Sequence, residues 1–291
     1  MHAEIPILKI VNGLYYRKQF QGMTRIERES IYAEGIRRLS EIIKEVKKHP
    51  NVNFSDFGNR RSFNPYWHEF VVQRCAEELG TQFAGTSNVF LASKYGLNPI
   101  GTCAHELSMG ITALNFDGTE QSIKNALTTF REQWWKKYGH GLSVDLPDTY
   151  GTEYTMQSMP ETMLRDWKGQ RIDSMDPMQA IPYILDQYEK QGIDSRKKLV
   201  IPSDGLDLNS MIKIADAFGD RIKVSFGWGT KLTNNLGLQQ LSIVMKPYSI
   251  NGKFCVKLSD NIEKAMGEPS TVEAYKKALG YHETYTKVCE V

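Results

Sequence analysis

The chain has 291 residues, which allows one large domain or two modest ones around a sizeable core. Hydrophobic residues make up 41% and charged residues 24%, a composition that is typical of a globular protein and excludes a disordered chain. The formal net charge is only +2, and the sequence has neither a persuasive basic patch nor an apolar run of membrane-spanning length. We therefore expect neither nucleic acid nor a membrane as a partner.

The cysteines are far apart and form no CxxC pair: Cys75, Cys103, Cys255 and Cys289. This spacing argues against a cysteine-based zinc site. Because no cleavable apolar leader precedes the first expected element, the cysteines predict a reduced, cytoplasmic compartment.

The first element that we expect is a strand from Glu4 to Ile10, directly after the initial methionine. An amphipathic helix is predicted within residues 24–48, because its apolar positions step by four and three, and His49-Pro50 ends it. These positions are Tyr32, Ile36, Leu39, Ile43 and Val46.

Seven short strand-like runs follow, each ending in polar or glycine-rich residues: NFSDFGNRR, TQFAGTSN, NPIGTCAHE, LSVDLPDT, GQRIDSMDP, KKLVIPSDGLD and RIKVSFGWGT. Helical stretches such as residues 66–79, 122–138 and 178–191 separate most of them. The repeated order of strand, polar turn and helix predicts a parallel α/β architecture. Candidate functional residues follow nearly every strand, which favours a barrel. An open doubly wound sheet is the alternative, but it would concentrate chemistry at one switch point. In a barrel, the following residues would face one cavity: Ser87, His105, Asp148, Asp173, Asp204 and Gly229.

Several motifs can be interpreted in two ways. In RIDSMDP, Arg171 and Asp173 suit a phosphorylated sugar, whereas Asp176 is better explained as the cap of a helix that begins near Pro177. The glycines of SFGWGT could approach a phosphate, although a single GxG is weak support, and the DG of SDGLD is often only a turn. Phe57 with the two arginines of FGNRRSF could hold a flat anion or simply lie at the surface. For Trp134, Trp135 and Tyr138 at helical spacing, we expect a core or interface role.

Taken together, eight ordered motifs closely resemble the nicotinate phosphoribosyltransferase family, from about residue 4 to residue 265: FGNRRSF, FAGTSNVFLA, IGTCAHE, DTYGT, DSMDP, LVIPSDGLD, SFGWGTKLTN and NGKFCVKLSD. The resemblance implies an enzyme of NAD and pyridine nucleotide biosynthesis, a glycosyltransferase that also acts as an ATP-dependent ligase. It would convert nicotinate and phosphoribosyl diphosphate to nicotinate mononucleotide and diphosphate, with Mg²⁺ and with ATP as a co-substrate.

The fold that the resemblance implies is an incomplete α/β barrel with a flanking, partial α+β domain. The barrel would span residues 53–245, and residues 1–52 and 246–291 would belong to the flanking part. The family completes its active site across a dimer, so a homodimer is expected.

The resemblance also implies residue roles. His105 matches the family's phosphorylated histidine, whose other ring nitrogen needs an orienting acceptor. Glu106 points elsewhere in either a strand or a helix, so we expect that acceptor to be a carboxylate from another strand. Asp148 and Asp173 would stabilise positive charge at the ribose. The substrate-binding residues implied are Phe57, Arg60, Ser87, Arg171, Ser203, Asp204, Gly205, Gly229 and Thr230, and no protein metal site is implied.

Ser87 indicates which base is used. Enzymes that resemble this family but use nicotinamide have aspartate at the matching position. A serine hydroxyl can donate to the carboxylate of nicotinate, which an aspartate would repel.

Two departures from the family pattern keep a second hypothesis open. Met175 stands where the family has glycine, so a bulky side chain is expected in a loop that approaches ligand. The family's N-terminal segment is also not seen in this sequence. Either a separate N-terminal chain supplies that segment to an active enzyme, or the protein is a non-catalytic remnant or binding subunit.

Overall fold

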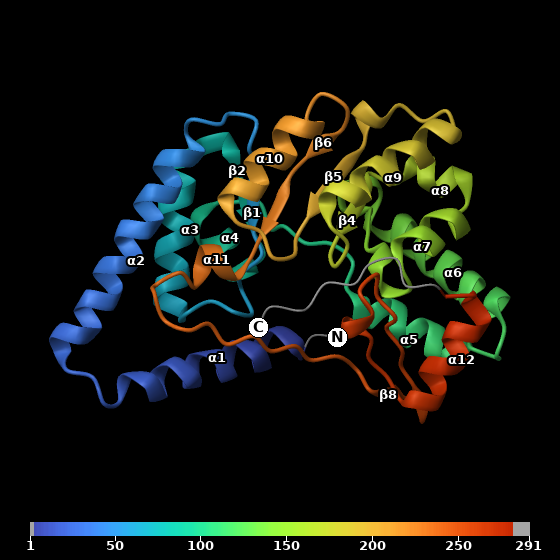
Figure 1. The fold of residues 1–291 in the computed structure, drawn as a ribbon, viewed down its shortest axis with the longest axis horizontal. Coiled ribbons are helices and arrows are strands. Elements are labelled where there is room, and N and C mark those ends of the chain that lie inside the picture. The colour runs from blue at the N-terminus through green and yellow to red at the C-terminus, as the bar shows by residue number, and fades with distance from the viewer. Residues whose placement is uncertain (1–2, 282–291) are drawn as a thin grey trace.

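The structure, a computed structural model, describes residues 3–281 (Figure 1). Its helices are α1 Glu4–Phe20, α2 Arg25–Val46, α3 Pro65–Leu79, α4 Val89–Tyr95, α5 His105–Asn115, α6 Glu120–Tyr138, α7 Thr152–Ser158, α8 Glu161–Asp166, α9 Pro177–Lys190, α10 Leu208–Phe218, α11 Thr230–Thr233 and α12 Pro269–Leu279. Its strands are β1 Phe54–Asp56, β2 Phe83–Thr86, β3 Val144–Asp145, β4 Gly169–Ile172, β5 Leu199–Pro202, β6 Lys223–Val224, β7 Phe226–Trp228, β8 Ser249–Ile250 and β9 Lys253–Phe254.

The strands form two parallel sheets, in the orders β2-β1-β7 and β3-β4-β5-β6, and one antiparallel hairpin, β8-β9. In the first sheet Phe54 pairs with both Phe83 and Phe226. Helices α2 and α3 lie outside this sheet, and α9 lies outside the second (Figure 1). The predicted α/β class is confirmed. Over residues 3–281 no ladder of hydrogen bonds joins the two parallel sheets into a closed ring.

Local sequence explains where several helices begin. At α2 the Thr24 hydroxyl accepts from the Glu27 amide at 3.3 Å, and the Glu27 carboxylate accepts from the Thr24 amide at 2.6 Å, a capping box. At α9 the Asp176 carboxylate accepts from the Met178 amide at 2.9 Å, with proline at the first helical position. The predicted capping role of Asp176 is therefore confirmed, as are the helices predicted within residues 24–48, 66–79, 122–138 and 178–191.

Aromatic and branched side chains fill the main core beneath the parallel sheets. Phe54 of β1 packs edge-on against Trp228 of β7, with ring centroids 5.2 Å apart, and both side chains are buried. Trp134 and Trp135 of α6 pack partly buried against this core, as expected, while Tyr138 is exposed. A smaller cluster joins α6 and α12 to residues 256–258, beside the β8-β9 hairpin. The predicted domain boundaries stay a prediction, and residues 282–291 lie outside the described chain.

The strand predicted from Glu4 to Ile10 is wrong: the segment begins helix α1. Its buried residues, Leu8, Asn12 and Tyr16, recur every four positions, which is the helical period. Pro6 lies in the first turn, where backbone amides lack helical partners in any case. The side chains of Ile5 and Ile7 are almost half exposed.

The NPIGTCAHE run is also not a strand. Ile100 donates its amide to the Thr86 carbonyl at 2.9 Å, and Thr86 donates to the Asn98 carbonyl at 3.2 Å. Pro99, which has no amide hydrogen, makes only an isolated bridge to Thr86. The segment therefore follows the edge of β2 without becoming a ladder, and His105 begins α5 instead of following a strand.

Cys75, Cys103 and Cys255 are buried and free, and Cys289 lies outside the described residues. Within residues 3–281, no helix combines the length and apolar character needed to cross a bilayer.

Candidate active site

The carboxyl ends of the parallel strands carry most of the predicted site residues. Each of these residues lies at the end of a strand or shortly after it, and parallel strands place such ends at a common edge. They are Phe57 and Arg60 after β1, Ser87 after β2, Asp148 after β3, Asp173 after β4, Ser203, Asp204 and Gly205 after β5, and Gly229 and Thr230 after β7. Arg171 lies within β4 itself.

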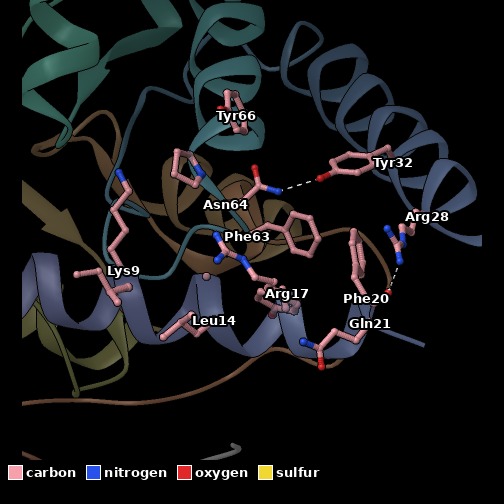
Figure 2. Close-up of a pocket in the computed structure, with 14 residues that line it drawn as sticks. Lys9, Leu14, Arg17, Phe20, Gln21, Arg28, Tyr32, Phe63, Asn64 and Tyr66 are labelled. Carbon is pink, nitrogen blue, oxygen red and sulfur yellow. Dashed lines mark hydrogen bonds between the residues drawn. The ribbon is translucent and has the colours of Figure 1, made fainter. Parts of the chain in front are cut away.

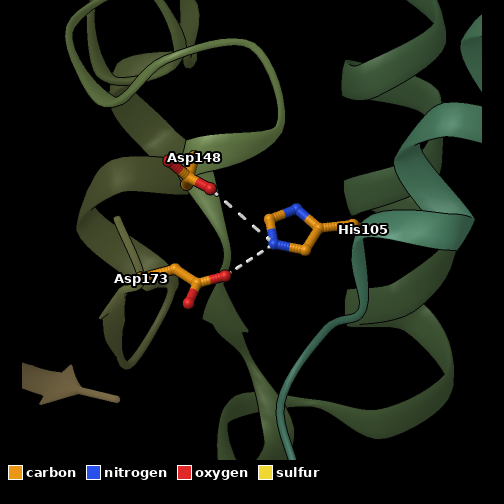
Figure 3. A group of neighbouring side chains, drawn as sticks. All are labelled: His105, Asp148 and Asp173. Atoms are coloured by element: carbon orange, nitrogen blue, oxygen red, sulfur yellow. Dashed lines mark hydrogen bonds and ion pairs between the residues drawn. The ribbon is translucent and has the colours of Figure 1, made fainter. Parts of the chain in front are cut away.

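His105, at the first position of α5, lies against two carboxylates (Figure 3). Its Nε2 is 2.7 Å from Asp173 Oδ2 and 3.7 Å from Asp148 Oδ2. Its Nδ1 is 3.0 Å from the Thr149 hydroxyl. The expectation of an orienting carboxylate from another strand is confirmed. Glu106 points elsewhere, as expected, and pairs with Lys246 at 2.7 Å.

The surroundings of His105 fix its charge and its tautomer. Burial, together with the positive charge of Lys257, lowers its pKa to about 4, so the imidazole is neutral at neutral pH. An ionised carboxylate can only accept a hydrogen bond, so Nε2 carries the proton that faces Asp173. The lone pair therefore remains on Nδ1, where it accepts from the Thr149 hydroxyl, and Nδ1 is the atom that a nucleophilic imidazole would use.

Asp148 is held by a segment for which the sequence suggested no role, residues 257–260. Lys257 Nζ is 2.8 Å from Asp148 Oδ2, and the Asp260 amide donates to Oδ1 at 2.9 Å. Burial acts to raise the pKa of Asp148, but Lys257, His105 and the Asp260 amide together outweigh it, and the pKa lies below its usual range. Ser174 and Ser259 also donate to this carboxylate. A lysine inside the apolar run FCVKL was the signal that could have identified this contact.

Asp260 packs behind Asp148 and is itself held by Thr152. Its two carboxylate oxygens accept from the Thr152 amide and hydroxyl, each at 2.6 Å. Burial, and then the negative charge of Asp148, raise the pKa of Asp260 to about 7. One of two adjacent buried carboxylates is thus neutral in slightly acidic solution.

This raised pKa predicts how Asp260→Asn will behave. A carboxyl whose folded pKa of about 7 exceeds its ordinary value of 3.8 contributes stability below pH 3.8, and this contribution is lost as pH rises to 7. The amide cannot ionise, so the variant should gain stability over the wild type across that window. Urea unfolding at about pH 5 and about pH 8 measures the difference. A difference that does not change with pH would contradict the assignment.

The predicted base-binding residues form a second part of the site. The Arg171 guanidinium lies 5.6 Å from the centre of the Phe57 ring and donates to the Ser203 hydroxyl at 2.8 Å. A Cβ atom on Gly227 would lie 2.6 Å from the Phe57 ring, so only glycine allows the ring to pack there. In the described part of the chain the buried Ser87 hydroxyl has no hydrogen-bond partner. A hydrogen bond with a ligand could satisfy this hydroxyl.

The two arginines of FGNRRSF differ in their partners. Arg60 pairs with Glu4 of α1. Among the described residues, the buried Nε of Arg61 has no partner, and burial lowers the pKa of Arg61. The sequence offered both arginines as possible anion ligands, and the family resemblance selected Arg60 alone.

The remaining predicted residues lie at the outer part of the strand edge. Asp204 pairs with Lys264 at 2.6 Å and is about half exposed. Gly205 has φ +60°, a conformation that favours glycine. Gly229 immediately precedes α11, which begins at Thr230.

The Met175 side chain packs into the protein interior. Its side chain is 7% exposed and belongs to the main hydrophobic core. Among described residues other than glycine, only Asn251 and Ser259 have positive φ, so Met175 needs no conformation reserved for glycine.

Comparison with known proteins identifies the family. The sequence model of the nicotinate phosphoribosyltransferase (NAPRTase) family matches residues 52–283. The chain belongs to this family. A crystal structure of nicotinate phosphoribosyltransferase from Porphyromonas gingivalis is similar to it with a TM-score of 0.81 and 32% identity, over 96% of this chain and 70% of that one.

Two further family structures agree. The Vibrio cholerae enzyme has a TM-score of 0.85 and 27% identity, over 96% of this chain and 67% of that one. A putative nicotinate phosphoribosyltransferase from Saccharomyces cerevisiae has a TM-score of 0.80 and 26% identity, over 96% of this chain and 68% of that one. Family and fold together indicate phosphoribosyl transfer to nicotinate in NAD salvage.

Proposed function

We propose that the chain transfers a phosphoribosyl group from phosphoribosyl diphosphate to nicotinate, coupled to ATP hydrolysis through a phosphohistidine at His105. The observation that carries the proposal is the neutral imidazole, with Nε2 directed at Asp173 and a lone pair on Nδ1. Nδ1 would attack the γ-phosphorus of ATP and release ADP, and water would later cleave the P–N bond.

We propose a cytoplasmic location from the unpaired cysteines.

The carboxylates suit the transfer step itself. As the bond from the anomeric carbon to diphosphate breaks, positive charge develops on the ribose, and the pyridine nitrogen of nicotinate forms the new bond. The pKa of Asp173 lies well below its usual range because the hydrogen bond from His105 and the charge of Arg171 outweigh the effect of burial. Asp173 and Asp148 are thus both ionised and can stabilise the developing charge without reorganisation.

Residues at the carboxyl ends of the parallel strands would bind the phosphates. Arg60 and Arg171 would contact the phosphates of phosphoribosyl diphosphate. Gly229 and Thr230 would bind its 5′-phosphate through the backbone amides at the start of α11. Ser203, Asp204 and Gly205 would line the neighbouring edge, next to Lys264.

Mg²⁺ is proposed to arrive with phosphoribosyl diphosphate. The ligand atoms of His105, Asp148 and Asp173 lie within 4.8 Å of one another, which resembles a metal site. However, Asp148 is already paired with Lys257 at 2.8 Å, and the imidazole is engaged by Asp173. These residues do not fit a resident ion, whereas Mg²⁺ commonly binds through substrate phosphates.

Ser87 is proposed to select the acid over the amide, with Phe57 stacking on the pyridine ring. Ser87→Asp replaces a donor by a negative charge, which should repel the carboxylate of nicotinate and accept from the amide of nicotinamide. We expect the ratio of kcat/KM for the two bases to shift towards nicotinamide by about 10 to 200-fold. Steady-state kinetics with both bases measures it, and Ser87→Ala is the control that removes the donor without adding charge. An unchanged ratio would exclude Ser87 from the base site.

The second hypothesis, a binding subunit without activity, loses one of its two supports because Met175 lies in the core. Formation of nicotinate mononucleotide from nicotinate, phosphoribosyl diphosphate and ATP by the purified chain tests the proposed function. Product from the wild type and none from Asp173→Asn supports it. Tight substrate binding without any product would favour the binding subunit.

Completion of the enzyme by a second copy or by a separate N-terminal chain stays a prediction. A groove of about 810 Å³ runs along α1, lined by apolar side chains such as Leu14, Phe20 and Tyr66 (Figure 2). None of the predicted site residues lines it. Thermal unfolding at increasing concentrations of an added N-terminal segment would test this prediction, because a partner that binds the folded form raises the Tm.

A further inference from the structure

A buried histidine and aspartate lie behind the proposed base site, and the mechanism above uses neither. Asp56 ends β1, and His68 lies one turn into α3. His68 Nε2 is 2.7 Å from Asp56 Oδ2, and both side chains are fully buried. Burial acts to raise the pKa of Asp56, but His68 and the other donors outweigh it and the carboxylate is ionised.

The Asp56 carboxylate also joins the two loops that would contact the base. Its Oδ1 accepts from the Gly58 amide at 2.7 Å, in the loop that begins with Phe57. Its Oδ2 accepts from the Thr86 hydroxyl at 2.6 Å. The main-chain carbonyl of Asp56 accepts from the main-chain amide of Ser87 at 2.7 Å. One residue therefore fixes both the position of the Phe57 loop and that of Ser87.

His68 extends the connection to the start of α4. Its Nδ1 is 3.4 Å from the side-chain nitrogen Nδ2 of Asn88. The backbone amide of Asn88 donates to the Thr86 hydroxyl at 3.0 Å. Asn88 in turn caps α4 by accepting from the Leu91 amide at 3.3 Å. The residues on either side of Ser87 are thus held by the same network.

Stability alone does not explain this arrangement. The parallel ladder between β1 and β2 already joins the two strands. A buried carboxylate has a desolvation cost that well-packed apolar residues would avoid. The Asp56 carboxylate instead accepts from three separate groups: the Gly58 amide, His68 Nε2 and the Thr86 hydroxyl. A shared acceptor fixes the positions of its donors relative to one another.

We infer that Asp56 and His68 are a positioning pair that sets the distance between the Ser87 hydroxyl and the Phe57 ring, and thereby the affinity for nicotinate. This inference rests on the proposed function. Neither residue touches the reacting atoms, so the effect should appear in the KM for nicotinate more than in kcat. The KM for phosphoribosyl diphosphate should change less, because only Arg60 among its proposed ligands lies on the Phe57 loop.

The test compares His68→Leu with His68→Gln in steady-state kinetics. Leucine cannot donate to Asp56, and displacing a contact group by about 1 Å costs on the order of 100-fold, so we expect the nicotinate KM to rise by about 10 to 100-fold. Glutamine retains a donor and should restore most of the affinity. Thr86→Val removes one bond to the same carboxylate and serves as a milder variant if His68→Leu does not fold.

A matched control separates positioning from general destabilisation. Lys198 is buried at the amino end of β5, and its Nζ donates to the carbonyls of Leu164, Arg165 and Trp167. Lys198→Met should lower the Tm and leave the nicotinate KM unchanged. An unchanged nicotinate KM in His68→Leu and Thr86→Val, with an active wild type, would overturn the inference alone. A wild type that neither binds nor uses nicotinate would overturn the proposed function and this inference with it.

Discussion

Replacing His105 by alanine is expected to abolish nicotinate-dependent ATP hydrolysis and to leave a slow transfer that does not depend on ATP. The imidazole is the proposed phosphoryl acceptor, whereas Asp148 and Asp173 remain to bind the sugar. Removing a nucleophile that acts as part of a unit can cost about 10³-fold or more, so the ATPase should fall to background. ADP release and mononucleotide formation, assayed in parallel, give the two rates.

The control for this variant is His140→Ala, which removes an exposed histidine in the turn after α6. It should retain both activities. ATP hydrolysis that persists in His105→Ala at the rate of the control would mean that His105 is not the phosphoryl acceptor.

Replacing Lys257 by methionine is expected to destabilise the fold and to abolish the transfer. The side chains of Lys257 and Asp148 are 5% and 1% exposed, so the variant leaves a buried carboxylate without its cation. Removing one partner of such a pair typically costs about 3–5 kcal/mol. The pKa of His105 should also rise, because Lys257 helps to lower it.

The double variant Lys257→Met with Asp148→Asn distinguishes the two effects. With both charges removed, most of the stability should return, because no uncompensated ion remains buried. Activity should not return, because Asp148 is proposed to stabilise the ribose. Urea unfolding and mononucleotide formation measure both, with Lys213→Met on the exposed face of α10 as the control. A stable and fully active Lys257→Met would refute the role given to this pair.

The parallel α/β class and the gathering of polar groups at one strand edge could be predicted from the sequence. Asp173 and Ser203 each follow a short apolar run, and parallel strands bring such positions together. The carboxylate partner of His105 could also be predicted, because adjacent residues cannot face each other on a helix or a strand.

Features that depend on long-range packing could not be predicted. Glu4–Ile10 has apolar residues compatible with either period, and only the contacts of Leu8, Asn12 and Tyr16 select the helix. Lys257 lies 109 residues along the chain from Asp148, and no local pattern pairs them. The direction of Met175 into the core likewise depends on neighbours that are distant in sequence.

The phosphohistidine is the central claim, and label transfer from γ-labelled ATP tests it most directly. The purified chain is incubated with labelled ATP and Mg²⁺, digested, and the labelled peptide is identified by mass spectrometry. The account predicts an acid-labile phosphoryl group on His105 that is lost when nicotinate and phosphoribosyl diphosphate are added. It also predicts no label on His105→Ala. Label on another residue, or none on a chain that still couples ATP hydrolysis to transfer, would contradict the account.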